Sequence, residues 1–337
     1  MKSVKKFLIL FLFFVCFQTA RAEWTKQNSN TLSWLQDVYF LNEQTGWIVG
    51  SGGAYLITKD GGKTWKKEKV FTEDVIRQVH FTDDQTGWLL CERDVYALGA
   101  NSPSYLLKTT NGGAYWERIE FTDNQRKRIT KFFFADNGAG LAIGEAGAFF
   151  AMKDDKKTWK SLPSPSRYLM FDGIFTDDLH GVVVGAGGSI LFTEDAGLSW
   201  NKGSIFGEPN SKLNSVFFIN QKNGWTVGAQ GKIFQTVNGG KTWREQKSNV
   251  TKDLTDVFFS STAEGWAIGD EGTILRTATA GNVWTAVQSN AKHKLERVFF
   301  IGKKGFAVGF GGTILAYEES GKNINSAVLP PKLRTRN

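Results

Sequence analysis

The chain has 337 residues, of which 41% are hydrophobic, 14% aromatic and 22% charged, and its formal net charge is +8. The high aromatic content, together with only 6 Pro, excludes a disordered or collagen-like chain. Two Cys exclude a disulfide framework and a Cys-rich zinc site, and three His leave little room for His-based metal chemistry.

Residues 1–22 have the pattern of a secretory signal peptide. A basic start, Met1 to Lys6, precedes an apolar run from Phe7 to Phe17, and Ala20-Arg-Ala22 supplies the small residues of a cleavage site. The apolar run is too short to be a permanent membrane-spanning helix. Cleavage after Ala22 would remove four basic residues and leave a net charge of +4. This modest charge argues against a nucleic-acid partner, so we expect an exported protein that binds no nucleic acid.

Removal of the leader would also remove Cys16 and leave Cys91 as the one remaining thiol. An alternative interpretation is a lipoprotein with its lipid on Cys16, but Val15 stands where a small residue is expected. No later segment reaches 18 consecutive apolar residues, so the sequence predicts no transmembrane helix.

One unit of about 40 residues recurs seven times after the leader. Its marker is a Gly followed by an aromatic or aliphatic residue, found at Gly46, Gly87, Gly140, Gly181, Gly224, Gly265 and Gly305. Each unit begins with a β-rich run such as Asp256-Val-Phe-Phe259, continues through a second strand that starts at the marker Gly and through a third strand, and then reaches a turn, which is followed by Trp in six of the seven units. Seven such units predict an all-β fold, a seven-bladed β-propeller of four-stranded antiparallel blades. A linear β-solenoid is the alternative.

The two ends of the repeat region predict how the ring closes. The turn Trp of the last unit is missing, and its expected place falls on Ile324 in a degraded motif. Trp24 near the mature N-terminus supplies the missing Trp, so we expect the N-terminal segment to form the outer strand of the last blade. The alternative is that residues 322–328 form that strand. The propeller would then span residues 23–318, followed by a basic tail, residues 319–337.

One long interval between repeats indicates an insertion in the second blade. It falls near Cys91 to Ser104, between the second and third strands, and it ends in Ser102-Pro103-Ser104. We expect this segment, including Ser104, to be an exposed loop.

The turns carry complete or degraded copies of the pattern Thr/Ser-x-Asp-x-Gly-x-Thr/Ser-Trp, the Asp-box or BNR repeat. The best copies are residues 58–65 and 193–200, and Thr279 replaces the Asp in the sixth unit. Asp accepts hydrogen bonds from turn N–H groups, Gly permits positive φ, and Trp packs between blades. Because these carboxylates lie on separate turns, we expect them to stabilise the fold and not to form a catalytic site.

The enzymatic alternative is a sialidase-like glycosidase or a glycan-binding propeller, since sialidases also carry Asp-boxes. The sequence lacks the Arg-Ile-Pro marker of sialidases, and His80, His180 and His293 show no metal-ligand or catalytic spacing. We therefore predict a non-enzyme with no catalytic residue, no metal and no cofactor.

A binding surface is the favoured alternative. The loops that lead into the first strands of six blades carry basic residues and share one face of a propeller. We predict that this face binds an acidic protein segment or another anionic group. The candidate residues are Arg77, Arg126, Lys127, Arg128, Arg167, Lys212, Lys252, Lys294 and Arg297. Scattered, solvated Lys and Arg are the competing interpretation.

Over residues 24–318 the repeat resembles the photosystem II stability/assembly factor family. The resemblance rests on the segments Gly46 to Trp65, Gly224 to Trp243 and Gly265 to Trp284. It implies a non-catalytic, seven-bladed propeller of the thylakoid lumen or periplasm, with chaperone-like binding of a reaction-centre subunit through an Arg-rich surface. The resemblance implies that the basic loops form this surface, although they do not match it residue by residue. We therefore expect a protein partner, such as a membrane-complex subunit, and a monomeric protein in the periplasm, thylakoid lumen or extracellular space.

Overall fold

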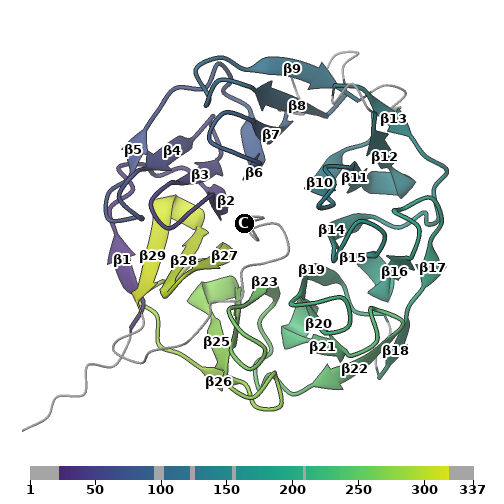
Figure 1. The fold of residues 1–337 in the computed structure, drawn as a ribbon. Helices are drawn as coiled ribbons and strands as arrows, with labels where there is room; N and C mark the ends of the chain where they lie inside the picture. Colours follow the sequence, from purple (N-terminus) through teal and green to yellow (C-terminus); the bar gives the residue numbers. More distant parts are fainter. Residues whose placement is uncertain (1–22, 95–101, 122–125, 154–156, 208–209, 319–337) are drawn as a thin grey trace, which may run out of the picture.

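The structure, a computed structural model, describes residues 23–94, 102–121, 126–153, 157–207 and 210–318. Seven separate sheets, each built on four antiparallel strands, surround a central axis (Figure 1), which confirms the predicted seven-bladed propeller. The signal peptide and the basic tail predicted for residues 1–22 and 319–337 lie outside the described residues.

The first strand of each blade lines the axis, and the fourth lies at the rim (Figure 1). The first strands are β2 (Leu35–Phe40), β6 (Val75–Phe81), β10 (Ile129–Phe134), β14 (Met170–Phe175), β19 (Leu213–Phe218), β23 (Leu254–Phe259) and β27 (Leu295–Ile301). The second strands are β3 (Gly46–Gly50), β7 (Gly87–Glu92), β11 (Gly140–Gly144), β15 (Gly181–Gly185), β20 (Gly224–Gly228), β24 (Gly265–Gly269) and β28 (Lys304–Gly309).

The third and fourth strands form the outer halves of the blades. The third strands are β4 (Tyr55–Thr58), β8 (Ser104–Thr109), β12 (Phe149–Met152), β16 (Ile190–Thr193), β21 (Ile233–Thr236), β25 (Ile274–Thr277) and β29 (Thr313–Glu318). The fourth strands are β5 (Lys66–Lys67), β9 (Glu117–Glu120), β13 (Trp159–Ser161), β17 (Asn201–Lys202), β22 (Thr242–Gln246), β26 (Thr285–Ala286) and, in the last blade, β1 (Thr25–Gln27).

Strand β1 joins the two ends of the propeller. It pairs with β29 in the register Thr25↔Ala316, so the N-terminal segment forms the outer strand of blade seven, as the sequence predicts. The preceding Trp24 is buried and packs edge-on against Trp266 of blade six at 5.5 Å between ring centroids. Closure therefore covers a sheet edge and fills the last seam between blades with an aromatic side chain.

Two features differ from the expected pattern. Blade five has a fifth strand, β18 (Ser204–Phe206), which pairs in parallel with β22. The insertion in blade two does lie between β7 and β8, but Ser104 is not in its exposed loop. Ser104 is the first, fully buried residue of β8, where its hydroxyl accepts a hydrogen bond from the Ile129 N–H of the next blade.

The loops divide the molecule into two faces because the strands alternate in direction. Turns between the first and second strands share one face with the Asp-box turns between the third and fourth, and we call this the Asp-box face. The loops from a fourth strand to the next first strand share the other face with the turns between the second and third strands. We call those loops connector loops and that side the connector face. For example, the Gly53 N–H in a blade-one turn donates to Asp74 O in the next connector loop at 3.0 Å.

The Asp-box residues hold their own turns together. In blade one, Asp60 accepts hydrogen bonds from the Thr64 N–H at 3.0 Å and from the hydroxyls of Thr58 and Thr64 at 2.7 and 2.6 Å. The Thr64 bonds are the main cause that lowers the pKa of Asp60 to about 2. In blade six, the Thr279 hydroxyl accepts the equivalent bond, from the Val283 N–H at 2.9 Å. The motif is thus a structural turn.

We predict that Asp60→Ala lowers the free energy of unfolding at pH 7 by about 1 kcal/mol, because turn donors lose their acceptor. Asp60→Asn should leave the free energy of unfolding at pH 7 nearly unchanged, since Asn238 accepts the same bond from the Thr242 N–H in blade five. Because the pKa of Asp60 is lowered on folding, its carboxylate stabilises the fold above the ordinary pKa of 3.8, and this stabilisation is lost as the pH falls towards about 2. Thermal unfolding at pH 7 and pH 3 should therefore show a smaller acid loss for Asp60→Asn than for the wild type. Equal losses for Ala and Asn at pH 7 would contradict the role of the acceptor.

Candidate functional site

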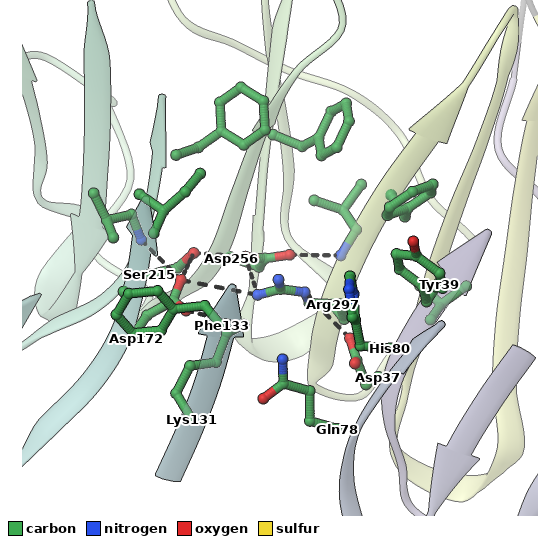
Figure 2. A pocket seen from close by; sticks show the side chains of 18 of the residues that line it. Asp37, Tyr39, Gln78, His80, Lys131, Phe133, Asp172, Ser215, Asp256 and Arg297 are labelled. Carbon is green, nitrogen blue, oxygen red and sulfur yellow. Dashed lines mark hydrogen bonds and ion pairs between the residues drawn. The ribbon is translucent and has the colours of Figure 1, made fainter. Parts of the chain in front are cut away.

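The central channel carries one polar residue from each blade at an equivalent position. In every first strand the pairing register shifts at a β-bulge. The residue that follows the shift lies three positions before the Phe that pairs with the first Gly of the second strand. We call the set the polar ring. Its members are Asp37, Gln78, Lys131, Asp172, Ser215, Asp256 and Arg297 (Figure 2).

The polar ring connects each blade to the next. Three aspartates accept backbone hydrogen bonds from the following blade: Asp37 from Val79 at 3.0 Å, Asp172 from Val216 at 3.0 Å and Asp256 from Val298 at 2.8 Å. The Gln78 amide pairs with both backbone groups of Phe132 at 2.8 and 3.0 Å, the Lys131 Nζ lies 3.0 Å from Asp172, and the Ser215 hydroxyl donates to Asp256 at 2.6 Å. Arg297 completes the circle at 3.3 Å from Asp37.

Arg297 is the central charge of this ring (Figure 2). Its guanidinium lies 3.3 Å from Asp37, 3.1 Å from Asp256 and 3.9 Å from Asp172. Burial alone would lower its pKa, but the three carboxylates outweigh burial and raise it. Arg297 is therefore a half-buried ion-pair partner on β27, and not a solvated side chain of a connector loop.

The pKa values of the three ring aspartates shift in different directions, although all three side chains are buried. Burial raises the pKa of Asp37 and of Asp256 above the ordinary value, although Arg297 opposes it. Burial also acts to raise the pKa of Asp172, but the positive charges of Lys131 and Arg297 outweigh it and lower the pKa. Two cations, Lys131 and Arg297, thus face three carboxylates, and each carboxylate lies within ion-pair distance of at least one of them.

Towards the Asp-box face, the channel becomes aromatic. A cavity of about 140 Å³ lies among the polar ring and the residues two positions further along each strand, which include Tyr39, His80 and Phe133 (Figure 2). The Tyr39 hydroxyl donates to Phe81 O at 2.8 Å, and its ring lies 4.9 Å from the His80 ring. His80 is thus a packed channel residue.

Towards the connector face, the channel widens into a polar funnel of about 330 Å³. Its lining includes the basic residues Arg77, Arg128, Lys131, Lys212, Lys294 and Arg297. The same lining includes the acidic residues Asp37, Glu92, Asp172, Asp253, Asp270 and Glu296. Positive and negative side chains are therefore equal in number in the funnel, which was not evident from the loop sequences.

Many of the predicted basic residues are paired with acids. Five of the nine candidates line the funnel: Arg77, Arg128, Lys212, Lys294 and Arg297. The ion pairs of the candidates, apart from those of Arg297, are Arg77 with Glu92 at 2.8 Å, Arg128 with Glu145 at 2.6 Å and with Glu92 at 3.4 Å, Lys294 with Glu296 at 3.1 Å and Lys252 with Glu271 at 2.5 Å. These pairs reduce the charge that each side chain offers to a partner.

The remaining basic candidates lie together on one side of the connector face. Arg126, Lys127 and Arg167 are in the connector loops of blades three and four, and Lys212 precedes β19 in blade five. Among the described residues none of the four forms an ion pair with a carboxylate, and Lys212 lies 4.7 Å from the centre of the Phe171 ring. We call Arg126, Lys127, Arg167 and Lys212 the basic arc.

Sequence reasoning missed the polar ring as a unit. Its signal was present, because the seven residues occupy the same position relative to the Phe of each first strand. Single residues such as Ser215 carry no mark of function when each repeat is considered alone. Alignment of the repeats by their Phe would have identified the ring, but not its pairing or burial.

The channel carboxylates do not resemble a hydrolase site. Glycoside hydrolysis requires two carboxyl groups that flank the sugar, whereas Asp37, Asp172 and Asp256 are buried, bonded to backbone N–H groups and close to Arg297. Within the described ranges, no group of three or more His, Cys, Asp or Glu side chains is placed to hold a metal ion. The same part of the chain contains no helix long and apolar enough to cross a membrane.

Comparison with known proteins identifies the family. The family model described as photosynthesis system II assembly factor YCF48 matches residues 17–164, 151–247, 207–287 and 242–336, which together span nearly the whole chain. The chain belongs to this family. The family relationship agrees with the resemblance drawn from the repeat.

Curated members of the YCF48 family match shorter regions. Photosystem II assembly lipoprotein Ycf48 of Synechococcus sp. strain CC9902 is 34% identical over 87 residues, which cover 25% of this chain and 26% of that protein. Photosystem II assembly protein Ycf48 of Synechococcus sp. strain JA-3-3Ab is 28% identical over 147 residues, or 42% of this chain and 43% of that protein. The chain thus aligns with less than half the length of either relative.

Solved structures extend the similarity of fold to nearly the full chain. The structure of YCF48 bound to D1 peptide has a TM-score of 0.73 at 21% identity and covers 91% of this chain and 98% of that one. YCF48 from Cyanidioschyzon merolae has a TM-score of 0.72 at 20% identity, with coverage of 88% and 99%. Virginiamycin B lyase from Staphylococcus aureus also reaches 0.73, at 12% identity, with coverage of 89% and 100%. Because an enzyme has the same architecture, the function of the family member must be argued from its surface.

Proposed function

We propose that this protein is an exported, non-catalytic assembly factor that binds a protein segment on its connector face. Membership of the YCF48 family and the structure of a member bound to D1 peptide support a peptide of a membrane-complex subunit as the partner. The signal-peptide pattern of residues 1–22 supports a site of action in the periplasm, the thylakoid lumen or the extracellular space.

The basic arc is the observation that carries this proposal. Arg126 and Arg167 are exposed on adjacent connector loops, and Lys127 lies beside Arg126. Long-range attraction to carboxylates increases the rate of encounter, and a guanidinium binds a carboxylate with two parallel hydrogen bonds. An acidic segment of a partner would therefore bind over blades three to five, next to the funnel.

The funnel gives the partner a second, polar contact. Lys212 belongs to both the basic arc and the funnel lining, whereas Asp253 and Asp270 line the funnel from the neighbouring blade six. A segment that extends from the arc into the funnel would meet positive charge first and negative charge beyond it. Such a gradient fixes the direction of a bound peptide and favours a segment with acidic residues at one end.

Neutralising the arc tests the proposed function. We predict that Arg126→Gln, Lys127→Gln and Arg167→Gln together weaken binding of a fluorescently labelled D1 peptide about tenfold, because each exposed charge contributes about 0.5 kcal/mol. Fluorescence anisotropy at 50 mM and 300 mM NaCl would measure the affinity and its salt dependence, and the triple variant should show the weaker dependence.

A matched variant on the opposite face separates local charge from net charge. Lys59, Lys63 and Lys222 are exposed on the Asp-box face, and their replacement by Gln removes the same charge. This control should bind the peptide as the wild type does. The proposed function is wrong if the wild type does not bind, and the basic arc is wrong if both triple variants lose the same affinity.

A further inference from the structure

One backbone hydrogen bond recurs around the mouth of the funnel in six blades. Its donor is the first N–H after the second strand, and its acceptor is the carbonyl six positions before the Phe that pairs with the first Gly of that strand. The bonds are Ser51 to Trp34 at 2.9 Å, Glu145 to Arg128 at 2.8 Å, Ala186 to Leu169 at 2.8 Å, Ala229 to Lys212 at 2.9 Å, Asp270 to Asp253 at 2.9 Å and Phe310 to Lys294 at 3.0 Å. All the acceptor residues of this set except Trp34 line the funnel. The bond therefore marks equivalent positions around the funnel mouth.

Blades one and seven place aromatic side chains at these mouth positions. Trp34 is the acceptor residue of blade one, a position that is Arg or Lys in blades three, five and seven. Phe310 is the donor residue of blade seven, a position that is Glu or Asp in blades three and six. The two rings meet edge-on at the junction of the blades, with 5.6 Å between centroids. The funnel mouth thus changes from charged to apolar at this junction.

Leu32 enlarges the apolar surface beside the two rings. Its side chain is 89% exposed, and it lines an open groove of about 750 Å³ together with Gly311, the neighbour of Phe310. We call Leu32, Trp34 and Phe310 the apolar corner. A side chain so exposed adds little to the stability of the fold, whereas adjoining exposed apolar residues are typical of interaction sites. Trp and Phe are also enriched in protein interfaces.

Backbone bonds hold the apolar corner in place. The Trp34 N–H donates to the Ser51 hydroxyl at 2.9 Å, and the Trp34 carbonyl accepts from the Ser51 N–H. Phe310 is fixed by its bond to the Lys294 carbonyl, and the Lys294 Nζ lies 5.7 Å from the centre of the Trp34 ring. Because the loops are joined before a partner arrives, binding there costs little conformational entropy.

The apolar corner and the basic arc lie on opposite sides of the funnel. In a ring of seven blades, the junction of blades seven and one lies opposite blade four (Figure 1). Blade four is the middle blade of the basic arc and carries Arg167, and Lys212 of the arc occupies the same mouth position as Trp34. A segment that binds the arc and crosses the funnel therefore reaches the corner.

We propose that the apolar corner binds an aromatic or aliphatic side chain of the same partner segment that binds the basic arc. This inference rests on the proposed function and adds the chemistry of the second end of the segment. Acidic residues lie over the arc by charge complementarity, and the apolar residue packs against Trp34 and Phe310, where water is excluded. Because charged mouth positions flank the corner, a narrow peptide fits it better than a flat lipid surface.

A double-mutant cycle between protein and peptide tests this contact. The probes are the fluorescently labelled D1 peptide and a version with Ser in place of each aromatic and aliphatic residue. Trp34→Ala with Phe310→Ala should weaken binding of the D1 peptide about tenfold, equally at low and high salt, because salt screens charges and not apolar contacts. The Ser-substituted peptide should bind this variant and the wild type with the same affinity, since it lacks the contact.

A matched variant on the Asp-box face controls for the loss of exposed apolar side chains. Tyr115 and Leu198 are 65% and 84% exposed in Asp-box turns, and Tyr115→Ala with Leu198→Ala should bind both peptides as the wild type does. The midpoint of thermal unfolding checks that each variant is folded. Leu32→Ser changes only an exposed side chain, and it should weaken binding of the D1 peptide about threefold even if the aromatic variant is unstable.

The outcomes separate this inference from the proposed function. If the arc variant loses affinity and the corner variants do not, the corner is wrong and the proposed function stands. Equal losses for the two peptides would also contradict the corner, since no apolar side chain would then be involved. The corner is wrong as well if its variants lose only binding to phosphatidylcholine–phosphatidylglycerol vesicles, or only self-association, because the occupant is then a lipid surface or a second copy. If the wild type does not bind the D1 peptide, both proposals fail.

Discussion

Arg297→Met is expected to lower the free energy of unfolding at pH 8 by about 3–5 kcal/mol, because it leaves buried carboxylates without their counter-charge. Asp37, Asp172 and Asp256 all lie within 3.9 Å of this guanidinium. Urea denaturation followed by Trp fluorescence would measure the loss. Arg244→Met, an exposed Arg of β22, is the control and should cost less than about 1 kcal/mol.

The pH dependence of the Arg297→Met loss identifies its cause. A raised carboxyl pKa in the folded state contributes stability below the ordinary pKa, and this contribution is lost as the pH rises through the raised value. Asp37 and Asp256 have raised pKa values in the wild type, and loss of Arg297 should raise them further. The loss should therefore be smaller at pH 5 than at pH 8, and adding Asp37→Asn and Asp256→Asn should recover part of it. A loss that is independent of pH would show that packing, not charge, explains the effect.

Trp24→Ala should cost about 3–5 kcal/mol of unfolding free energy, the usual range for a fully buried Trp. The ring of Trp24 lies 5.5 Å from Trp266 and 5.9 Å from Phe300, so its removal opens a cavity where the two ends of the chain meet. Strand β1 has only three residues to hold the closure by backbone pairing. The side chain before it therefore carries much of the stability of the closed ring.

Thermal and urea unfolding of Trp24→Ala, compared with Trp34→Ala, would measure this contribution. Trp34 is 37% exposed on the connector face, and its truncation should cost less than about 1 kcal/mol. If both variants lose the same stability, closure does not depend on Trp24. If Trp24→Ala also increases proteolysis of residues 23–27, the loss is localised at the closing strand.

The sequence by itself determined the architecture. Each Gly-Trp strand, each turn and each Trp is defined by neighbours within one repeat, and such local rules act before the chain closes. The missing seventh turn Trp even indicated the closing role of Trp24, because a count of equivalent positions needs no three-dimensional information. The fifth strand of blade five was not predictable in this way, since β18 pairs with β22, which lies about 40 residues further along the chain.

Only the tertiary structure decided which charged residues are available to a partner. Arg297 appeared to be one of several basic residues that lead into first strands, but folding places it against aspartates of three other blades. Arg77 and Arg128 meet Glu92 in the same way, whereas Arg126, Lys127 and Arg167 keep no such ion pair among the described residues. Residues separated by whole repeats meet only because seven strands converge on one axis. Burial there determines the pKa values and the pairing, and neither can be read from spacing along the chain.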